Sequence, residues 1–287
     1  MIVADRAEEQ AAATAAAHAA GARVIGVERV DAALDRLSQV SVDAVLIELG
    51  GSDAAARDRL LDWTNRAVSE GSTSAIVSIP HALVDDVMAR LEEPRVSLLC
   101  DAGLQERATE LAVAFAKGRN ALNDQGVEAE AERLRRLSEE VARIAGALAE
   151  ISSTARPYAP PAPRDDVELA AEPQMDANMV RNLIRIRRLR EQFFSKDLFA
   201  DPAWDMLLDL LAARLERSRV AVSSLCIAAA VPATTALRWI RTLTEHGLFV
   251  RRDDPEDGRR IFIELSDAAT DAMHAYFQTA HQMGLRL

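Results

Sequence analysis

The sequence predicts three structured parts in order: an α/β doubly wound domain of the flavodoxin-like type, a coiled-coil helix, and a mainly-α winged helix-turn-helix domain. Three observations predict this order. Short apolar runs alternate with helical patterns over roughly the first 120 residues, a heptad of apolar residues follows, and two helical runs then precede two strand-like runs around a charged turn. The predicted boundaries are 1–124, 125–153 and 178–287, with a Pro-rich linker at 154–177.

Five short apolar runs are predicted to form the buried strands of the first domain, at residues 2–4, 23–27, 44–47, 75–79 and 96–99. Helical patterns lie between these runs. Strands that alternate with helices indicate a parallel sheet covered by helices on both faces. Five such units in roughly 120 residues are typical of flavodoxin-like, doubly wound geometry.

The order and spacing of these units resemble a response-regulator receiver domain. Receiver domains phosphorylate an aspartate that ends the third strand, using an acidic pair after the first strand, a hydroxyl residue that ends the fourth and a lysine that ends the fifth. At the matching positions this chain has Asp5 in place of the acidic pair, Glu48 at the acceptor position and Ser78 for the hydroxyl residue. No lysine stands near the end of the fifth run.

This departure from the family pattern predicts a degenerate receiver that does not accept phosphate. A magnesium site needs several hard oxygen ligands, and formation of an acyl phosphate needs positive charge to balance it. Glu48 either mimics the phosphorylated state or is simply a polar residue at a strand end. We therefore expect this domain to take its signal by contact with an upstream signalling protein or by rearrangement of a dimer.

A heptad begins near Val127. Its apolar residues recur at alternating spacings of three and four: Leu134, Leu137, Val141, Ile144, Leu148 and Ile151. This spacing is typical of a coiled-coil seam and predicts a two-stranded stalk that joins a homodimer. The alternative is a single amphipathic helix that packs on its own domain. Residues 152–176, which follow, contain five of the ten prolines, so we expect an extended linker.

Two short helical runs open the stretch 223–266. Ser223 or Ser224 is expected to cap the first run, and Pro232 separates the two because proline has no amide hydrogen to donate. The second run has its apolar residues at helical spacing, and Gly247 ends it. Its opposite side carries the polar residues that would face a DNA major groove: Thr234, Thr235, Arg238, Arg241 and Thr242.

Two strand-like runs follow, Leu248–Val250 and Ile261–Ile263, around a charged turn with the strong turn signal Asp257-Gly258. The hairpin carries four arginines toward its tip: Arg251, Arg252, Arg259 and Arg260. Helix, turn, helix and a basic hairpin form the layout of a winged helix, whose second helix is sized for the major groove. The sequence therefore predicts a sequence-specific transcription regulator whose partner is double-stranded DNA.

From Leu225 to Leu265 the chain resembles the MarR family of winged-helix regulators. The resemblance rests on an arginine in the second helix, a glycine after it and an Asp-Pro-x-Asp-x-Arg wing: Arg238, Gly247, Asp254, Pro255, Asp257 and Arg259. It implies that Arg259 enters the minor groove and that Asp257, beside Gly258 in the turn, holds it. It also implies that the helices at Met179–Phe199 and Ala268–Leu287 pair across a dimer interface. Because MarR relatives often bind small aromatic molecules, a ligand-sensing repressor stays open as an alternative.

The formal net charge of −11 is unusual for a DNA-binding protein until it is divided by region. Residues 1–127 hold 12 Lys and Arg against 20 Asp and Glu, residues 128–177 hold 6 against 11, and residues 178–287 hold 16 against 14. The acidity therefore lies upstream of the winged helix, and DNA binding is expected to depend on a local basic patch. The weakly basic last region also leaves open a protein-interaction adaptor that never binds DNA.

No pattern in the sequence predicts an enzyme, a metal site or a cofactor. The histidines have no metal-ligand spacing with the cysteines, and no phosphate-binding glycine loop or nucleophile motif occurs. Cys100 and Cys226 lie in apolar runs, which favours burial over a role as oxidisable switches and favours a reducing compartment. No apolar run approaches the ~20 residues that span a bilayer, and no secretory signal is present, so we expect a cytoplasmic protein.

Overall fold

The computed structural model describes residues 1–121, 176–193, 199–257 and 260–283. The predicted stalk with its seam, and the predicted linker up to residue 175, lie outside the described residues. The described parts of Met1–Phe115 and Met175–Leu287 belong to one compact unit. Within it, an α/β domain precedes a helical domain with a small sheet.

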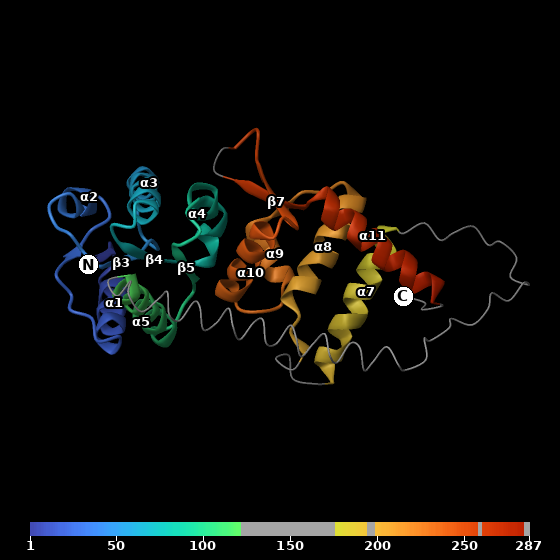
Figure 1. The fold of residues 1–287 in the computed structure, drawn as a ribbon, viewed down its shortest axis with the longest axis horizontal. Helices are drawn as coiled ribbons and strands as arrows, with labels where there is room; N and C mark the ends of the chain where they lie inside the picture. The colour runs from blue at the N-terminus through green and yellow to red at the C-terminus, as the bar shows by residue number, and fades with distance from the viewer. Residues whose placement is uncertain (122–175, 194–198, 258–259, 284–287) are drawn as a thin grey trace, which may run out of the picture. The chain divides into compact units, whose positions relative to one another are not determined.

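The N-terminal domain is built on a five-stranded parallel sheet (Figure 1). Its strands lie in the spatial order β2 (Val27–Glu28), β1 (Ile2–Ala4), β3 (Ala44–Glu48), β4 (Ser74–Ile79) and β5 (Ser97–Cys100). The strand order 2-1-3-4-5 is compatible with a doubly wound α/β fold, and it places the carboxyl ends of β1, β3 and β4 side by side. The register pairs Ala4 with Glu48 and Glu48 with Ser78, so two of the predicted receiver residues start from neighbouring positions.

Helices cover both faces of this sheet, as the uninterrupted apolar runs of its strands require. One face is covered by α2 (Ala33–Leu37), α3 (Ala54–Ser69), the 3₁₀ turn η1 (His81–Leu83) and α4 (Val84–Arg90). The other is covered by α1 (Ala7–Ala19) and α5 (Leu104–Ala121), and Figure 1 shows the two groups on opposite sides. The side chains of β3 alternate between the two faces of the sheet. Val45 and Ile47 are buried in the core under α2, α3 and α4, whereas Leu46 is buried in the core under α1 and α5.

The prediction of a buried second strand at residues 23–27 is wrong in extent and in burial. Strand β2 covers only Val27–Glu28, and the side chains of Ile25 and Val27 are 42% and 41% exposed. The physical reason is its place at the edge of the sheet, where β1 is its one neighbouring strand. A short apolar run has the same appearance in sequence whether its strand is central or at an edge.

The C-terminal domain begins with two packed helices, α7 (Ala177–Leu189) and α8 (Pro202–Glu216), with the 3₁₀ turn η2 (Arg190–Gln192) after α7. The remaining elements are β6 (Val220–Ala221), α9 (Val222–Ala228), α10 (Ala233–Glu245), β7 (Phe249–Asp253), β8 (Ile261–Leu265) and α11 (Asp267–Gln282). The three strands form an antiparallel sheet in the order β6-β8-β7. Helix, turn, helix and hairpin therefore occur where the sequence predicts them.

Local signals explain most of these helix ends. Asp201 accepts a hydrogen bond from the Trp204 amide and Pro202 occupies the first turn, so α8 begins as a capped helix. Gly247 has φ +70°, a left-handed conformation that favours glycine, directly after α10. The predicted serine cap of α9 is wrong, because the cap position is Ala221 and the Ser223 side chain bonds elsewhere.

In the described part of the chain, no single helix is both long and apolar enough to cross a membrane. Helices α9 and α10 meet that length and composition test only when taken together, and their axes are bent by 109° at the break between them.

Candidate nucleic-acid interface

Helix α10 is anchored by one apolar side. Ala236, Ile240 and Leu243 are buried, and they join the same core as Leu211 of α8 and Phe249 of β7. The spacing of four and three puts these side chains on one side of the helix, as predicted. The polar residues between them must then lie on the other side, where the predicted DNA contacts are.

The wing is the hairpin of β7 and β8, and its arginines pair locally. Arg252 lies 3.5 Å from Glu264, and Arg260 lies 3.8 Å from Asp257. Gly258 and Arg259 lie outside the described residues. Near the hairpin, Arg219 lies 5.3 Å from the centre of the Phe262 ring and 3.8 Å from Asp254. The hairpin also carries acidic side chains, so its charge is mixed: Asp253, Asp254, Glu256, Asp257 and Glu264.

The polar side of α10 does not face solvent throughout. The Thr234 side chain is 2% exposed, and its hydroxyl both accepts from the Cys100 amide at 2.9 Å and donates to the Cys100 carbonyl at 3.2 Å. The expectation that Thr234 lies on an open face of the helix is therefore wrong. Thr235, one residue later, is exposed, and Thr242 is half-buried.

Three arginines of the predicted interface also contact the N-terminal domain. Arg241 donates to the carbonyl oxygens of Pro94 at 2.6 Å and Val96 at 2.7 Å, and Arg238 forms an ion pair with Glu110. Arg251 of β7 donates to the carbonyl oxygens of Met88 and Leu91. Burial lowers the pKa of both Arg241 and Arg251 from the ordinary arginine value.

The position of β5 explains why the N-terminal domain offers these acceptors. Strand β5 is at the outer edge of the sheet, with β4 as its one neighbouring strand. An edge strand leaves backbone N–H and C=O groups without partners, and proteins commonly cover such edges. Thr234 satisfies both groups of Cys100, while Arg241 satisfies two carbonyls just before the strand. Helix α10 therefore covers the open edge of the sheet.

A second polar contact joins α9 to α4. The Ser223 amide donates to Asp85 at 2.9 Å and the Ser223 hydroxyl donates to the same carboxylate at 2.5 Å. Ser223 was predicted to cap its own helix, and a side chain from α4 supplies the carboxylate instead. The sequence contains no local signal for this contact, because nothing in it distinguishes Asp85 from its neighbour Asp86 on the same short helix.

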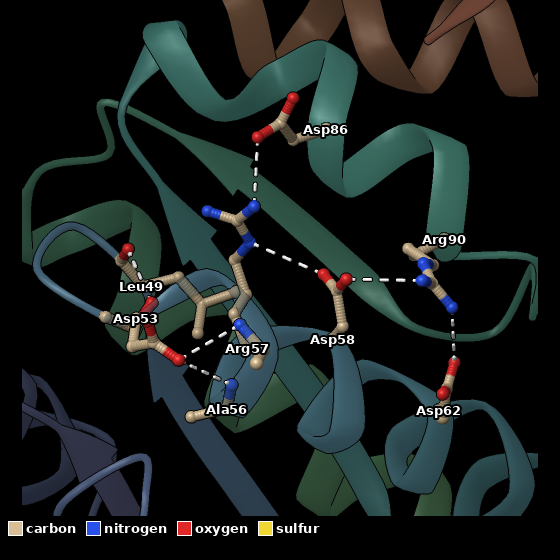
Figure 2. Close-up of polar contacts among 10 residues, drawn as sticks. Leu49, Asp53, Ala56, Arg57, Asp58, Asp62, Asp86 and Arg90 are labelled. Atoms are coloured by element: carbon tan, nitrogen blue, oxygen red, sulfur yellow. Dashed lines mark hydrogen bonds and ion pairs between the residues drawn. The ribbon is translucent and has the colours of Figure 1, made fainter. Parts of the chain in front are cut away.

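Ion pairs between α3 and α4 hold α4 in position, as Figure 2 shows. Arg57 of α3 is almost fully buried and donates to Asp86 of α4 at 2.9 Å. Arg90 of α4 in turn lies 3.2 Å from Asp58 and 3.7 Å from Asp62 of α3. Helix α4, which carries Asp85 and Met88, is thereby fixed to α3.

The two cysteines behave as predicted for buried, unreactive thiols. Cys100 of β5 and Cys226 of α9 are both buried, and both are free. Burial raises the pKa of each thiol to about 12, with a further contribution from Asp101 to Cys100. Thiols that stay protonated at neutral pH are poor nucleophiles.

The predicted receiver site contains an ion pair that the sequence did not reveal. Glu48 is 3% exposed, and both of its carboxylate oxygens accept from Arg107 of α5, at 2.7 and 3.0 Å. Arg107 also donates to the Ser78 hydroxyl at 3.1 Å. Glu48 and Ser78 therefore come together as predicted, whereas Asp5 instead accepts from the Val30 amide at 3.1 Å.

The receiver pattern has its positive charge on a lysine at the end of the fifth strand, so it does not predict Arg107. Arg107 is the fourth residue of α5 and supplies the positive charge from a different element. Its planar guanidinium binds a carboxylate through two parallel hydrogen bonds. In the described residues, no group of three or more His, Cys, Asp or Glu side chains has the arrangement of a metal site.

The arginines of α7 are largely committed to structure. Arg181 pairs with Glu216 at 2.9 Å, and Arg187 pairs with Asp205 at 3.0 Å, so both fasten α7 to α8. Large apolar side chains remain on the outside of α7 and just after it: Ile186, Leu189 and Phe193. Ile186 is 63% exposed and Phe193 is 73% exposed, which is unusual for apolar side chains of this size.

Residues 205–269 match a family model described as a winged helix DNA-binding domain. This match covers α9, α10, β7 and β8 together with most of α8, and it is less than half of the chain. A search of curated proteins finds no match.

Three solved structures are similar to part of the chain. One is the transcriptional regulator Tm0710 from Thermotoga maritima, with 17% identity over 35% of this chain and 69% of that one, and a TM-score of 0.24. Another is Bordetella bronchiseptica BpsR, whose DNA binding is regulated by 6-hydroxynicotinic acid, with 18% identity over 39% and 81% and a TM-score of 0.25. The third is the adhesin competence repressor AdcR of Streptococcus pyogenes, with 17% identity over 37% and 77% and a TM-score of 0.22.

Proposed function

We propose that this chain is a transcriptional regulator that binds double-stranded DNA through its winged helix. The observation that carries the proposal is the family match over residues 205–269, on a segment that folds as helix, turn, helix and hairpin. Helix α10 is the recognition helix, because a helix is the element that enters a major groove. The β7–β8 hairpin is the wing.

The proposed base and groove contacts come from α10: Thr235, Arg238, Arg241 and Thr242, whereas Thr234 is buried against Cys100. The proposed backbone and minor-groove contacts come from the wing: Arg251, Arg252, Arg259 and Arg260, with Asp257 and Gly258 supporting the turn. Three of the α10 side chains and Arg251 contact residues 88–110 in the structure. DNA binding of this kind therefore requires these contacts to be released.

The protein is further proposed to act as a homodimer of the MarR type. The exposed apolar side chains of Ile186, Leu189 and Phe193, with Tyr276 and Met283 at the other end of the domain's sequence, support pairing of α7 with α11 across two protomers. A dimer would present two recognition helices to half-sites about one helical turn apart.

The N-terminal domain is proposed to be a degenerate receiver that signals without phosphorylation. The bidentate Arg107 pair supports this reading because it occupies both oxygens of Glu48, the residue at the acceptor position. A signal would then reach the domain by contact with a partner protein or by rearrangement of the dimer.

A selection from random duplexes with the full chain, followed by two variants, tests the proposed DNA contacts. Arg238→Ala is expected to cost about 1–3 kcal/mol of binding free energy and to relax sequence preference at one position, because arginine binds base edges through paired hydrogen bonds. Arg259→Ala is expected to weaken binding to all sequences and to reduce the salt slope by about 1, as the loss of a phosphate contact does.

Arg59→Ala is the matched control for both variants, since Arg59 is an exposed arginine on α3. It should bind like the original chain. Gel shifts in which Arg238→Ala and Arg259→Ala keep the affinity and salt slope of the Arg59→Ala control would refute the assignment of this surface to DNA.

A protein-interaction adaptor is a second candidate, and one observation favours it. The polar side of α10 contacts a protein surface through Thr234, Arg238 and Arg241. An adaptor of this kind would use its winged helix to bind protein only. A selection from random duplexes that enriches no sequence would favour the adaptor.

A further inference from the structure

The N-terminal domain presents one continuous set of hydrogen-bond acceptors to α10, α9 and the wing, which we call the edge surface. It comprises the carbonyl oxygens of Met88, Leu91, Pro94, Val96 and Cys100 and the carboxylates of Asp85 and Glu110. We infer that the edge surface is the intramolecular partner of the recognition helix and wing, and that it competes with DNA for them. This inference rests on the proposed DNA-binding function.

The chemistry of the edge surface is similar to that of a nucleic-acid backbone. Arginine side chains carry donors only, so they bind surfaces rich in oxygen acceptors, whether those belong to phosphates, carboxylates or carbonyls. Arg241 and Arg251 each bind two carbonyl oxygens, and Arg238 binds a carboxylate. The same three guanidinium groups would otherwise bind phosphates or base edges.

The two partners exclude each other sterically. Thr234 is 2% exposed where it meets Cys100, so no base edge can approach its hydroxyl in this arrangement. Arg241 lies against the backbone before β5 through two hydrogen bonds. A major groove about 12 Å wide must enclose a recognition helix, and its walls would need the space that β5 and α4 occupy.

The contact between α10 and the edge surface has a polar and an apolar part. Met88 and Leu98 belong to the same buried cluster as Leu237 of α10. The hydrogen bonds and ion pairs around this cluster exchange readily for contacts with water or phosphate. A cavity of about 80 Å³ remains between Leu237, Arg238 and Arg241 on α10 and Met88, Ser97 and Leu98 on the other side. A surface that leaves such a void loses dispersion contacts and separates more easily than a close-packed core.

Competition has a quantitative consequence. When only the open fraction of the protein binds DNA, the observed dissociation constant equals the intrinsic one divided by that fraction. Any change that weakens the edge surface, without touching a DNA contact, must therefore tighten DNA binding. Asp85 and Glu110 allow this test because both lie in the N-terminal domain.

The experiment compares Asp85→Ala and Glu110→Gln in the full chain, with Asp35→Ala as control. Asp35 is an exposed acidic residue on α2, away from the edge surface. The first measurement is the rate of hydrogen exchange of the Cys100 amide. This amide donates to the Thr234 hydroxyl across the contact, and neither substitution removes one of its hydrogen-bond partners. The second measurement is the affinity for the duplex recovered by selection.

Both edge-surface variants should speed exchange at Cys100 and bind DNA about tenfold tighter, while Asp35→Ala matches the original chain. Adding the duplex to the original chain should also speed exchange at Cys100. If the N-terminal domain did not compete with DNA, adding the duplex would leave the exchange rate of the Cys100 amide unchanged. Unchanged exchange at Cys100 in both variants, or faster exchange with unchanged DNA affinity, overturns the inference.

Failure of the proposed function gives a different result. If neither the original chain nor any variant binds a duplex, the proposed DNA binding is refuted, and so is the proposed competition. Exchange at Cys100 would still respond to Asp85→Ala and Glu110→Gln in that case, so failure of DNA binding and failure of the competition give different results.

Discussion

At the scale of single residues, Arg241 shows that the role of a side chain depends on what faces it. Its guanidinium binds two carbonyl oxygens, those of Pro94 and Val96, which lie 147 and 145 residues away in the sequence. Helical spacing identifies Arg241 as a residue of the polar side of α10. The same spacing is compatible with a phosphate, a base edge or a carbonyl as its acceptor.

Glu9 of α1 illustrates an electrostatic cost that the sequence does not reveal. Burial raises the pKa of Glu9 above its ordinary value of 4.5, the nearby carboxylates of Glu48 and Asp5 raise it further, and the Arg6 amide and guanidinium partly oppose the rise. Because the folded pKa is raised, the stability that Glu9 contributes is present below its ordinary pKa and is lost as pH rises through the folded pKa.

Glu9→Gln should therefore raise the melting temperature near pH 7 and leave it unchanged near pH 4. Glutamine keeps an oxygen that can accept from the Arg6 amide, so the start of α1 stays capped. Thermal unfolding followed across this pH range measures the difference. Glu8→Gln, at an exposed neighbouring position, is the control. A Glu9→Gln protein that is less stable near pH 7 would contradict the prediction.

At the scale of elements, α5 connects two sites. Arg107 binds Glu48 and Ser78, and Glu110, three residues further on, binds Arg238 of α10. Residues three apart lie close together on a helix, so the two contacts are made from neighbouring positions on α5. A change at the Glu48 site therefore acts directly on the element that contacts α10.

Glu48→Gln is expected to lower the free energy of unfolding by about 1–3 kcal/mol, because a charge-assisted pair is lost and Arg107 is left partly unpaired. Hydrogen exchange in the first turns of α5 should become faster at the same time. Denaturation with urea measures the first effect. Glu70→Gln, at the exposed end of α3, should change stability by less than about 0.5 kcal/mol. Equal effects of the two substitutions would show that the Arg107 pair contributes little.

At the scale of the whole molecule, charge is divided between the two ends of the chain. The first 127 residues carry a strong excess of acidic side chains and the last 110 a slight excess of basic ones. Opposite charges favour association of the two ends and disfavour approach of the acidic end to a duplex. The edge surface lies within the acidic part and contacts arginines of the basic part.

The proposed dimer gives a prediction at this scale. Ile186→Asp places a charge on the exposed apolar side of α7. In the proposed dimer, residue 186 of each protomer is buried in the interface. Burial of one such side chain contributes about 1.5–3 kcal/mol, so the dimer dissociation constant should rise by more than about tenfold. Sedimentation over a dilution series measures it. Ile25→Asp, at the exposed edge of the N-terminal sheet, is the control and should leave the constant unchanged.

The sequence by itself determined most of the elements and their order, but β6 was not among the predicted strands. Uninterrupted apolar runs indicated the central strands, alternating spacings of three and four indicated the buried side of α10, and a proline, a glycine and a turn dipeptide indicated its ends and the wing. These signals are local, because they depend on the periodicity of one helix or strand. They identified β1, β3, β4 and β5 but overstated β2, whose position at the edge depends on its neighbours.

Only the tertiary structure decided what faces the polar side of each element. Arg107 reaches Glu48 across 59 residues, and Thr234 reaches Cys100 across 134, and neither partner is encoded by a motif near the other. A polar side chain is satisfied by any suitable donor or acceptor that folding brings within about 3 Å of it. Periodicity therefore tells which side of a helix avoids water, and the arrangement of the whole chain selects the groups that meet the other side.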